Sequence, residues 1–282
     1  FLANWVAGSS WWLSATFVIP NVVEMVLATW LARHFQVVHD FDQSPQKMLR
    51  FILLICLFPS TAGALAGASL ISFLEFSPFL PILLMWFVSS SVGMLSLLPL
   101  LLVFRRDRNL IGLRTTTRRR LLLYVAIVCL STYFALRYLP FPFIYLVIPL
   151  ILAAVETDTK TVAFLIFLES LVIGVIIHMG FLKQAMSSEN GLIFLNYLPI
   201  LVTFVPVLVL SASMNFFRSQ DRQKREIELA LQRKHNDIQM IIDNMPALIG
   251  FWDLDLKNRF ANRMYLDYFG WKSEDILGRH AR

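Results

Sequence analysis

The sequence predicts an all-α, multi-pass membrane helical bundle, followed by a coiled-coil-like linker helix and the truncated beginning of a small α/β domain. Hydrophobic residues make up 57% of the 282 residues and charged residues only 16%, whereas soluble domains carry about 25% charged residues. Residues 79–104 contain no charge, and a hydrocarbon core of about 30 Å needs roughly 20 apolar helical residues. The composition changes sharply at Arg218, after which the chain is charged. We therefore expect three parts, residues 1–217, 218–244 and 245–282.

The first part is predicted to cross the bilayer seven times. The expected spans are residues 11–33, 51–74, 79–104, 121–136, 141–155, 161–182 and 191–217. The span 141–155 is short and contains Pro142 and Pro149, so we expect it to be kinked or tilted. The chain begins with Phe1 in an apolar stretch. This start predicts a fragment of a longer protein whose first spans are missing.

Basic residues orient the predicted spans. Residues 105–120 hold seven arginines and one aspartate. With alternating spans, eleven of the lysines and arginines fall on the side of this loop and two, Arg137 and Lys183, on the other. Cytoplasmic loops are enriched in these residues, so the region after Phe217 is predicted to be cytoplasmic. Because the excess charge is confined to one loop, the lipid bilayer is the expected partner and nucleic acid is not.

The segment 218–244 is predicted to be a helix that leaves the membrane and pairs with a second copy of the chain. It contains no proline or glycine, and its apolar residues follow a heptad spacing that is interrupted at Lys234. These residues are Ile227, Leu231, Ile238, Ile241 and Met245. Barely three heptads are present, so a solvated linker helix is the alternative to a homodimer.

Residues 245–282 predict two short strands, 248–253 and 259–262, and two short helices. Asn262 stands where a helix N-cap is expected, and Gly270 and Gly278 stand where helices would end. Two strands cannot bury a core by themselves. We therefore expect the domain to continue beyond Arg282.

Polar residues inside apolar spans are the candidate sensing residues, because an unpaired charge at this depth costs several kcal/mol. Asn21 and Glu24 are three residues apart and share one helix face. Glu24, oriented by Asn21, could accept a cationic or hydrogen-bonding ligand; the alternative is a hydrogen bond that only joins two helices. Ser90 in the span 79–104 and Glu169 in the span 161–182 complete this set.

The sequence contains no catalytic constellation and no metal-binding spacing. Phosphate-binding glycine loops, HExxH motifs and nucleophile elbows are absent from it. Its two cysteines, Cys56 and Cys129, lie inside apolar segments and form no CxxC motif. No cofactor is assigned from these residues, and they do not decide whether the full-length protein is an enzyme.

Two resemblances give these parts a function. Residues 245–282 look like the beginning of a PAS sensory domain, through MPALIGFWD at 245–253, RFANRMYLDYFG at 259–270 and SEDILGRH at 273–280. The ligand-lining half of such a domain is absent, so no PAS cofactor residue follows. Residues 1–217 resemble the bacterial membrane-associated sensor domain (MASE, first type), through NVVE at 21–24, Trp86 with Gly93, LPL at 98–100 and YLPFP at 138–142.

The second resemblance implies a sensory input module in the bacterial inner membrane. Such modules control a cytoplasmic output, most often a diguanylate cyclase or phosphodiesterase that makes or breaks cyclic-di-GMP. It also adds Trp86 to the candidate sensing residues and a membrane protein to the candidate partners. The alternatives are the input region of a sensor histidine kinase, or a transporter or channel with a regulatory tail, for which the sequence shows no convincing inverted repeat.

Overall fold

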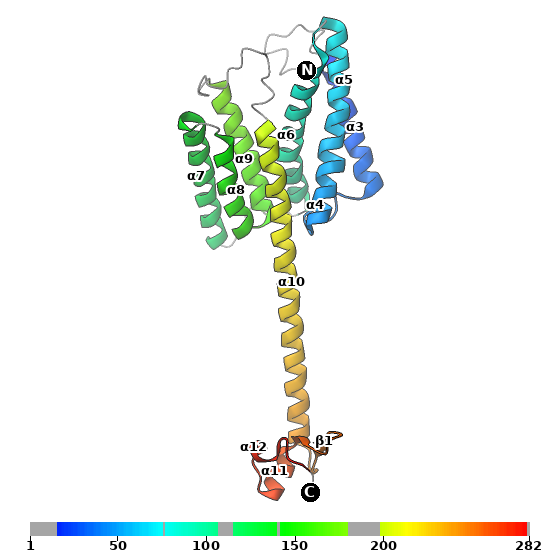
Figure 1. Ribbon diagram of the computed structural model, residues 1–282, viewed down its shortest axis with the longest axis vertical. Helices are drawn as coiled ribbons and strands as arrows, with labels where there is room; N and C mark the ends of the chain where they lie inside the picture. The colour runs from blue at the N-terminus through cyan, green and yellow to red at the C-terminus, as the bar shows by residue number, and fades with distance from the viewer. Residues whose placement is uncertain (1–15, 76, 107–114, 140–141, 180–197, 281–282) are drawn as a thin grey trace. The chain divides into compact units, whose positions relative to one another are not determined.

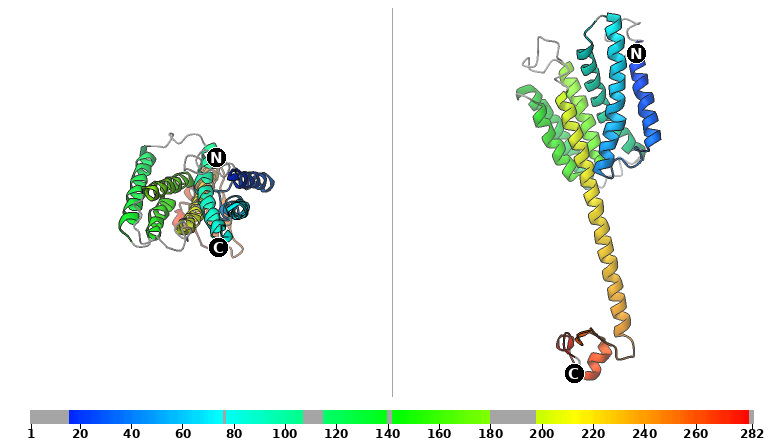
Figure 2. Two further views of the ribbon diagram at one scale, coloured as in Figure 1. Left: turned by 90° about the horizontal axis from the view of Figure 1, so that it is seen from above. Right: turned by 45° about the vertical axis from the view of Figure 1, so that its right-hand side comes forward.

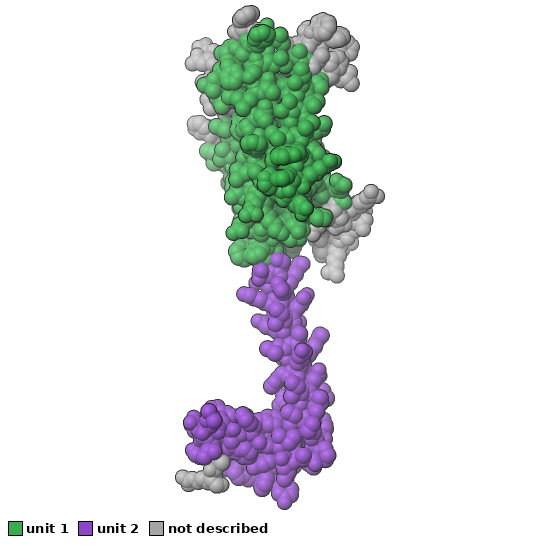
Figure 3. Space-filling model, turned by 90° about the vertical axis from the view of Figure 1, so that its right-hand side faces the viewer, with its two compact units in different colours: residues 1–218 green, residues 219–282 purple. Residues whose placement is uncertain are grey.

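The computed structural model describes residues 16–75, 77–106, 115–139, 142–179 and 198–280 (Figure 1). The chain divides into two compact units, Phe1–Arg218 and Ser219–Arg282, which Figure 3 shows in different colours. The predicted arginine loop between residues 107 and 114, the first 15 residues and the predicted polar turn at 183–190 lie outside the described residues.

Unit 1 is a bundle of helices that lie side by side (Figures 1 and 2). Its helices are α3 (Val18–Phe35), α4 (Pro45–Phe51), the π-helix η1 (Ile52–Leu57), α5 (Phe58–Glu75), α6 (Phe79–Arg106), α7 (Thr115–Tyr138), α8 (Phe143–Glu156), α9 (Thr159–His178) and the first part of α10 (Leu198–Asp243). Helix α5 packs on α3 and α6, and α9 packs on α6, α7 and α8. Figure 2 shows α3 and α7 at opposite edges of this bundle.

Five segments among the described residues are long and apolar enough to cross a membrane. They are Pro45–Leu74, Phe79–Arg105, Arg119–Tyr138, Thr159–Ile176 and Leu198–Asp243. The prediction of a helical bundle with several apolar spans is thus confirmed. Helix α3 is not among the five, and its described residues include Asn21, Glu24 and Arg33. Helix α8 corresponds to the predicted span 141–155. It has only 14 residues, which gives a length of about 21 Å, and it is therefore as short as predicted.

The outer surface of the bundle is as apolar as its core. Large side chains such as Met25, Leu101 and Leu130 are more than half exposed, whereas Ile55 and Phe204 are buried. A soluble protein rarely exposes large contiguous apolar patches, and in a bilayer the lipid chains cover such side chains. The packing therefore agrees with the composition in indicating a membrane bundle.

The structure changes the predicted boundaries in two places. The apolar span predicted from Phe51 extends back to Pro45, the helix start that the Ser44-Pro45 pair predicts. There Ser44 Oγ accepts a hydrogen bond from the backbone N–H of Lys47. The helix then continues through η1, a π-helical stretch that the apolar pattern does not reveal. The last span and the linker, predicted as separate segments, form one 46-residue helix, α10.

Side chains of two neighbouring helices pack directly against two glycines of α5. A Cβ atom at Gly63 would lie 3.2 Å from Glu24 Cβ in α3, and one at Gly67 would lie 2.8 Å from the ring of Trp86 in α6. This GxxxG pair therefore allows close packing, with one glycine serving each neighbouring helix.

Unit 2 contains the rest of α10, a two-stranded antiparallel sheet and two short helices. The elements are β1 (Gly250–Trp252), β2 (Asn258–Ala261), α11 (Arg263–Phe269) and α12 (Ser273–Ile276). Asn262 caps α11 by accepting a hydrogen bond from Tyr265 N at 3.1 Å, and its amide donates to the carbonyl oxygen of Ala247 at 2.8 Å. The sheet has only two strands among the described residues, which is too little to identify a PAS domain. The resemblance to such a domain therefore stays a prediction.

The heptad residues of α10 are exposed in the single chain. Ile227, Leu231, Ile238 and Ile241 are each more than half exposed. This exposure leaves the apolar stripe available to a second helix, and the predicted homodimer remains a prediction.

The contact between Gly67 and Trp86 predicts the effect of a single methyl group. Gly67→Ala should lower the free energy of unfolding by about 1–3 kcal/mol, because the rigid indole must shift. Gly174→Ala is the matched control, since nothing lies within 4 Å of a Cβ at Gly174. Thermal unfolding in detergent measures both variants, and equal midpoints for the two would contradict the close contact.

The turn before β2 predicts a pH effect. The backbone N–H of Lys257 donates to Asp253 Oδ1 at 2.9 Å and Arg259 Nε donates to Oδ2 at 2.6 Å, which holds the pKa of the Asp253 carboxyl below its ordinary value. Its stabilisation of the turn is therefore present above about pH 3.9, the pKa of an unfolded Asp, and is lost as the pH falls through the lower folded value. In an NMR titration the Lys257 amide shift should have its midpoint below 3.9, and Arg259→Gln should raise it. A wild-type midpoint at or above 3.9 would show that these bonds do not form.

Candidate functional site

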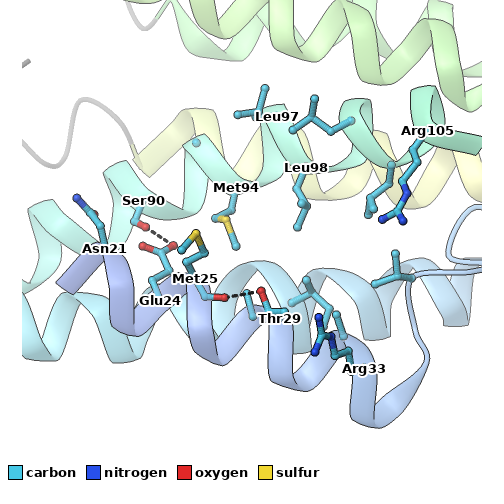
Figure 4. Close-up of a pocket in the computed structure, with 17 residues that line it drawn as sticks. Asn21, Glu24, Met25, Thr29, Arg33, Ser90, Met94, Leu97, Leu98 and Arg105 are labelled. Carbon is cyan, nitrogen blue, oxygen red and sulfur yellow. Dashed lines mark hydrogen bonds between the residues drawn. The ribbon is translucent and has the colours of Figure 1, made fainter. Parts of the chain in front are cut away.

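A cavity of about 730 Å³ lies between α3 and α6 (Figure 4). This volume is within the usual range for a ligand pocket, about 300–1,000 Å³. Its lining includes Asn21, Glu24, Met25, Ala28, Thr29, Ala32 and Arg33 of α3, and Ser90, Gly93, Met94, Leu97, Leu98, Leu101, Leu102 and Arg105 of α6. The lining is completed by Val38, which lies between α3 and α4, and by Ile55 of η1. We refer to this cavity as the α3–α6 groove.

One end of the groove is formed around the carboxylate of Glu24. This side chain is only 7% exposed, and its Oε1 accepts hydrogen bonds from Ser60 Oγ at 2.8 Å and from Ser90 Oγ. The two hydroxyls come from α5 and α6, so one carboxylate oxygen connects three helices. Among the described residues no hydrogen bond reaches Oε2, which leaves that oxygen for a ligand group that donates a hydrogen bond.

Ser60 has a second acceptor within reach. Its hydroxyl lies 2.7 Å from the carbonyl oxygen of Cys56, in η1, as well as 2.8 Å from Glu24. A hydroxyl carries a single proton, so Ser60 serves one of these acceptors at a time. Sequence reasoning missed Ser60, although it precedes Gly63 and Gly67 by three and seven residues, the spacing of one helix face.

Asn21 does not orient Glu24 as predicted, and the candidate residue Trp86 does not line the groove. Asn21 lines the groove, but its amide donates to Phe17 O of its own chain segment at 3.1 Å rather than to Glu24. Trp86 packs on Gly67 and edge-on against Phe17, with ring centroids 5.6 Å apart. Trp86 is not among the residues that line the groove.

Glu169 lies in α9 and is not part of the groove lining. It is 0% exposed, and neither carboxylate oxygen has a hydrogen-bond partner among the described residues. The hydroxyls of Ser91 and Thr132, on helices that pack against α9, are also buried without a partner in that part of the chain. Helix α9 therefore carries a costly polar side chain that the structure does not bring to Glu24.

Two arginines form the other end of the groove. Arg33 and Arg105 line it opposite Glu24, as Figure 4 shows. Both side chains are exposed, and no carboxylate within the described ranges pairs with either. The groove thus has an acidic, hydrogen-bonded end, apolar walls and a basic end.

Unit 1 also contains a polar junction that the sequence did not predict. Near the end of unit 1, α10 is tied to the turn between α8 and α9. Arg218 donates hydrogen bonds to two carbonyl oxygens at the end of α8. One belongs to Val155, and the other, at 2.6 Å, belongs to Thr157. Asn215 and Ser211 donate to Thr159 Oγ1, the latter at 3.1 Å. A guanidinium is well suited to the C-terminal carbonyls of a helix, which carry partial negative charge.

Among the described residues, no group of three or more His, Cys, Asp or Glu side chains is placed to hold a metal ion. The polar chemistry of the groove is therefore that of a carboxylate, hydroxyls and guanidinium groups. Groups of these kinds can bind other molecules through hydrogen bonds and charge.

The chain is similar in sequence to a part of a longer known protein. No family model matches the chain, and no solved structure matches it. The chain is 25% identical over 268 residues to the probable diguanylate cyclase DgcE of Escherichia coli strain K12. The match covers 94% of this chain and 23% of the relative. Nearly the whole chain is thus similar to a part of a much longer protein.

The two buried glutamates of the described residues, Glu24 and Glu169, should respond in opposite ways to replacement by methionine. Glu169→Met should raise the free energy of unfolding by about 1–3 kcal/mol, because it removes an unsatisfied buried group. Glu24→Met should lower it by a similar amount, because the hydrogen bonds that join α3 to α5 and α6 are lost. Thermal unfolding of both variants in the same detergent provides the measurement. Equal destabilisation by both would show that Glu169 has a partner in the folded protein.

Proposed function

We propose that this chain is the membrane-embedded sensory input region of a bacterial cyclic-di-GMP signalling protein. Residues 1–217 form the sensor, 218–244 the linker and 245–282 the beginning of a PAS domain. The sensor lies in the inner membrane, and the linker and PAS segment lie in the cytoplasm. The output of the full-length protein is diguanylate cyclase activity, a choice supported by the similarity to a part of a probable diguanylate cyclase.

The continuity of α10 is the observation that supports this proposal most. Its first part contributes Phe204, Leu208 and Ala212 to the buried core of unit 1. The same helix continues to Asp243 with its side chains exposed. A rigid helix of this kind carries a rotation or shift of its packed end to whatever follows it.

The α3–α6 groove is the proposed input site. A ligand there contacts α3 and α6 directly, the two helices that Glu24 joins to each other and to α5. Helix α6 packs on α9, and the first residue of α9, Thr159, is hydrogen-bonded to α10. This chain of contacts requires two packings of the bundle that differ by a few kcal/mol and that the ligand binds unequally.

Insertions into the exposed part of α10 test helical transmission. One to four residues placed after Gln232 in the full-length protein rotate the following segment by about 100° each. Cyclic-di-GMP production in cells should therefore change with the number inserted. A seven-residue insertion is the control, because it keeps the heptad phase and should retain activity.

Two results would reject the proposal. A full-length protein that produces no cyclic-di-GMP under any condition would exclude the output. Production that stays the same for all insertions of one to four residues would exclude the linker as the route of the signal.

A further inference from the structure

The walls of the α3–α6 groove are lined almost entirely by apolar side chains. Between its acidic and basic ends they are those of Met25, Ala28, Ala32, Val38, Ile55, Met94, Leu97, Leu98, Leu101 and Leu102. The polar exception is Thr29, whose hydroxyl donates to the carbonyl oxygen of Met25 at 2.7 Å. Figure 4 shows Met94 and Leu98 between the two ends. A long apolar surface of this kind binds a flexible hydrocarbon better than a polar metabolite, because burial of apolar area supplies the free energy.

The basic end lies where a lipid headgroup would be. Arg105 is the last residue of the apolar segment Phe79–Arg105, and Arg33 stands in the last turn of α3. Arginines at the end of an apolar span lie at the membrane interface. A guanidinium binds phosphate through paired hydrogen bonds, and two from different helices surround one phosphate better than either alone.

The length of the groove agrees with one leaflet of a bilayer. Nine residues separate Glu24 from Arg33 along α3, which is about 14 Å of helix. One leaflet occupies about half of a 30 Å hydrocarbon core. The charges also fix the direction of an amphiphile, because a phosphate is attracted by the arginines and repelled by Glu24.

We propose that the α3–α6 groove binds an anionic phospholipid, with its phosphate on Arg33 and Arg105 and one acyl chain along α3 and α6 as far as Glu24. The binding of the lipid does not depend on the proposed function. Only its consequence does, namely that the protein senses the lipid composition of the membrane. Binding itself is measured without any output domain.

Photo-crosslinking tests the assignment on the 282-residue chain in phosphatidylcholine vesicles. The probe is phosphatidylglycerol with a photoactivatable diazirine at the end of one acyl chain. Labelling should map to peptides that contain Met25 and Met94. Phosphatidylcholine with the same acyl diazirine carries the same phosphate but also a cationic choline, which the two arginines repel. It should therefore label these peptides about tenfold less, which corresponds to about 1.4 kcal/mol.

Two pairs of variants test the two ends of the proposed contact. Arg33→Gln with Arg105→Gln should reduce labelling about tenfold or more, whereas Arg119→Gln with Arg120→Gln, exposed arginines of α7 outside the groove, should not. Gly93→Leu should block the groove, because nothing lies within 4 Å of a Cβ there. Gly174→Leu in α9 has the same open surroundings and should label normally.

Three outcomes would overturn the lipid site. They are equal labelling by the two lipids, unchanged labelling after Arg33→Gln with Arg105→Gln, and complete competition by glycerol 3-phosphate, which would make the arginines a site for soluble anions. Unchanged labelling in Gly93→Leu would place the chain elsewhere and also reject the site. If labelling behaves as expected but cyclic-di-GMP production in the full-length protein ignores the same variants, the proposed function fails and the lipid site stands.

Discussion

The hydrogen bonds from Ser60 and Ser90 to Glu24 are the interaction on which the arrangement of α3, α5 and α6 depends. Glu24 is only 7% exposed, and a buried carboxylate needs hydrogen-bond partners from the protein. Gly63 makes the contact possible, because its missing side chain lets α3 approach α5. The same carboxylate closes one end of the α3–α6 groove. The side chain of Glu24 therefore takes part both in the packing of the three helices and in the lining of the groove.

The second constraint is the attachment of α10 to the rest of unit 1. Arg218 and Asn215 hold it to the residues around the α8–α9 turn. These contacts stand where the composition changes from apolar to charged. The end of α10 within unit 1 is thus fixed by directional hydrogen bonds, in addition to the apolar contacts of its buried side chains.

The sequence predicts the apolar helices well, and it singles out Glu24, which the structure places in the groove lining with two hydrogen-bond donors. An uncharged run of sufficient length has few alternatives to a membrane helix, and a carboxylate inside such a run must find a partner. Ser60 was missed because serine is common in membrane helices and its partner is 36 positions away in the sequence. The roles of Asn21 and Trp86 depend on neighbouring helices, which helix-face spacing does not reveal.

The ends of elements were less predictable than their existence. Apolar length shows where a membrane crossing lies but not where its helix begins, so the start of α7 at Thr115 precedes the predicted start at Leu121. The start at Pro45 is visible in the sequence because Ser44 is an N-cap residue followed by proline. In unit 2 the hydrogen bonds of Asn262 to α11 and to Ala247 were only partly foreseen. A capping asparagine is visible in sequence, whereas a bond to a distant carbonyl is not.

The π-helical stretch η1 gives the bundle a means of re-registering one helix without unfolding it. A π-turn holds an additional residue within a helix, and such turns are frequent at functional sites. If the widened turn moved past Ser60 toward the end of α5, that hydroxyl would rotate by about 100° and lose Glu24. The helix would keep nearly all its backbone bonds during this slide. If occupation of the α3–α6 groove moved the π-turn along α5, binding would be converted into a rotation of that helix.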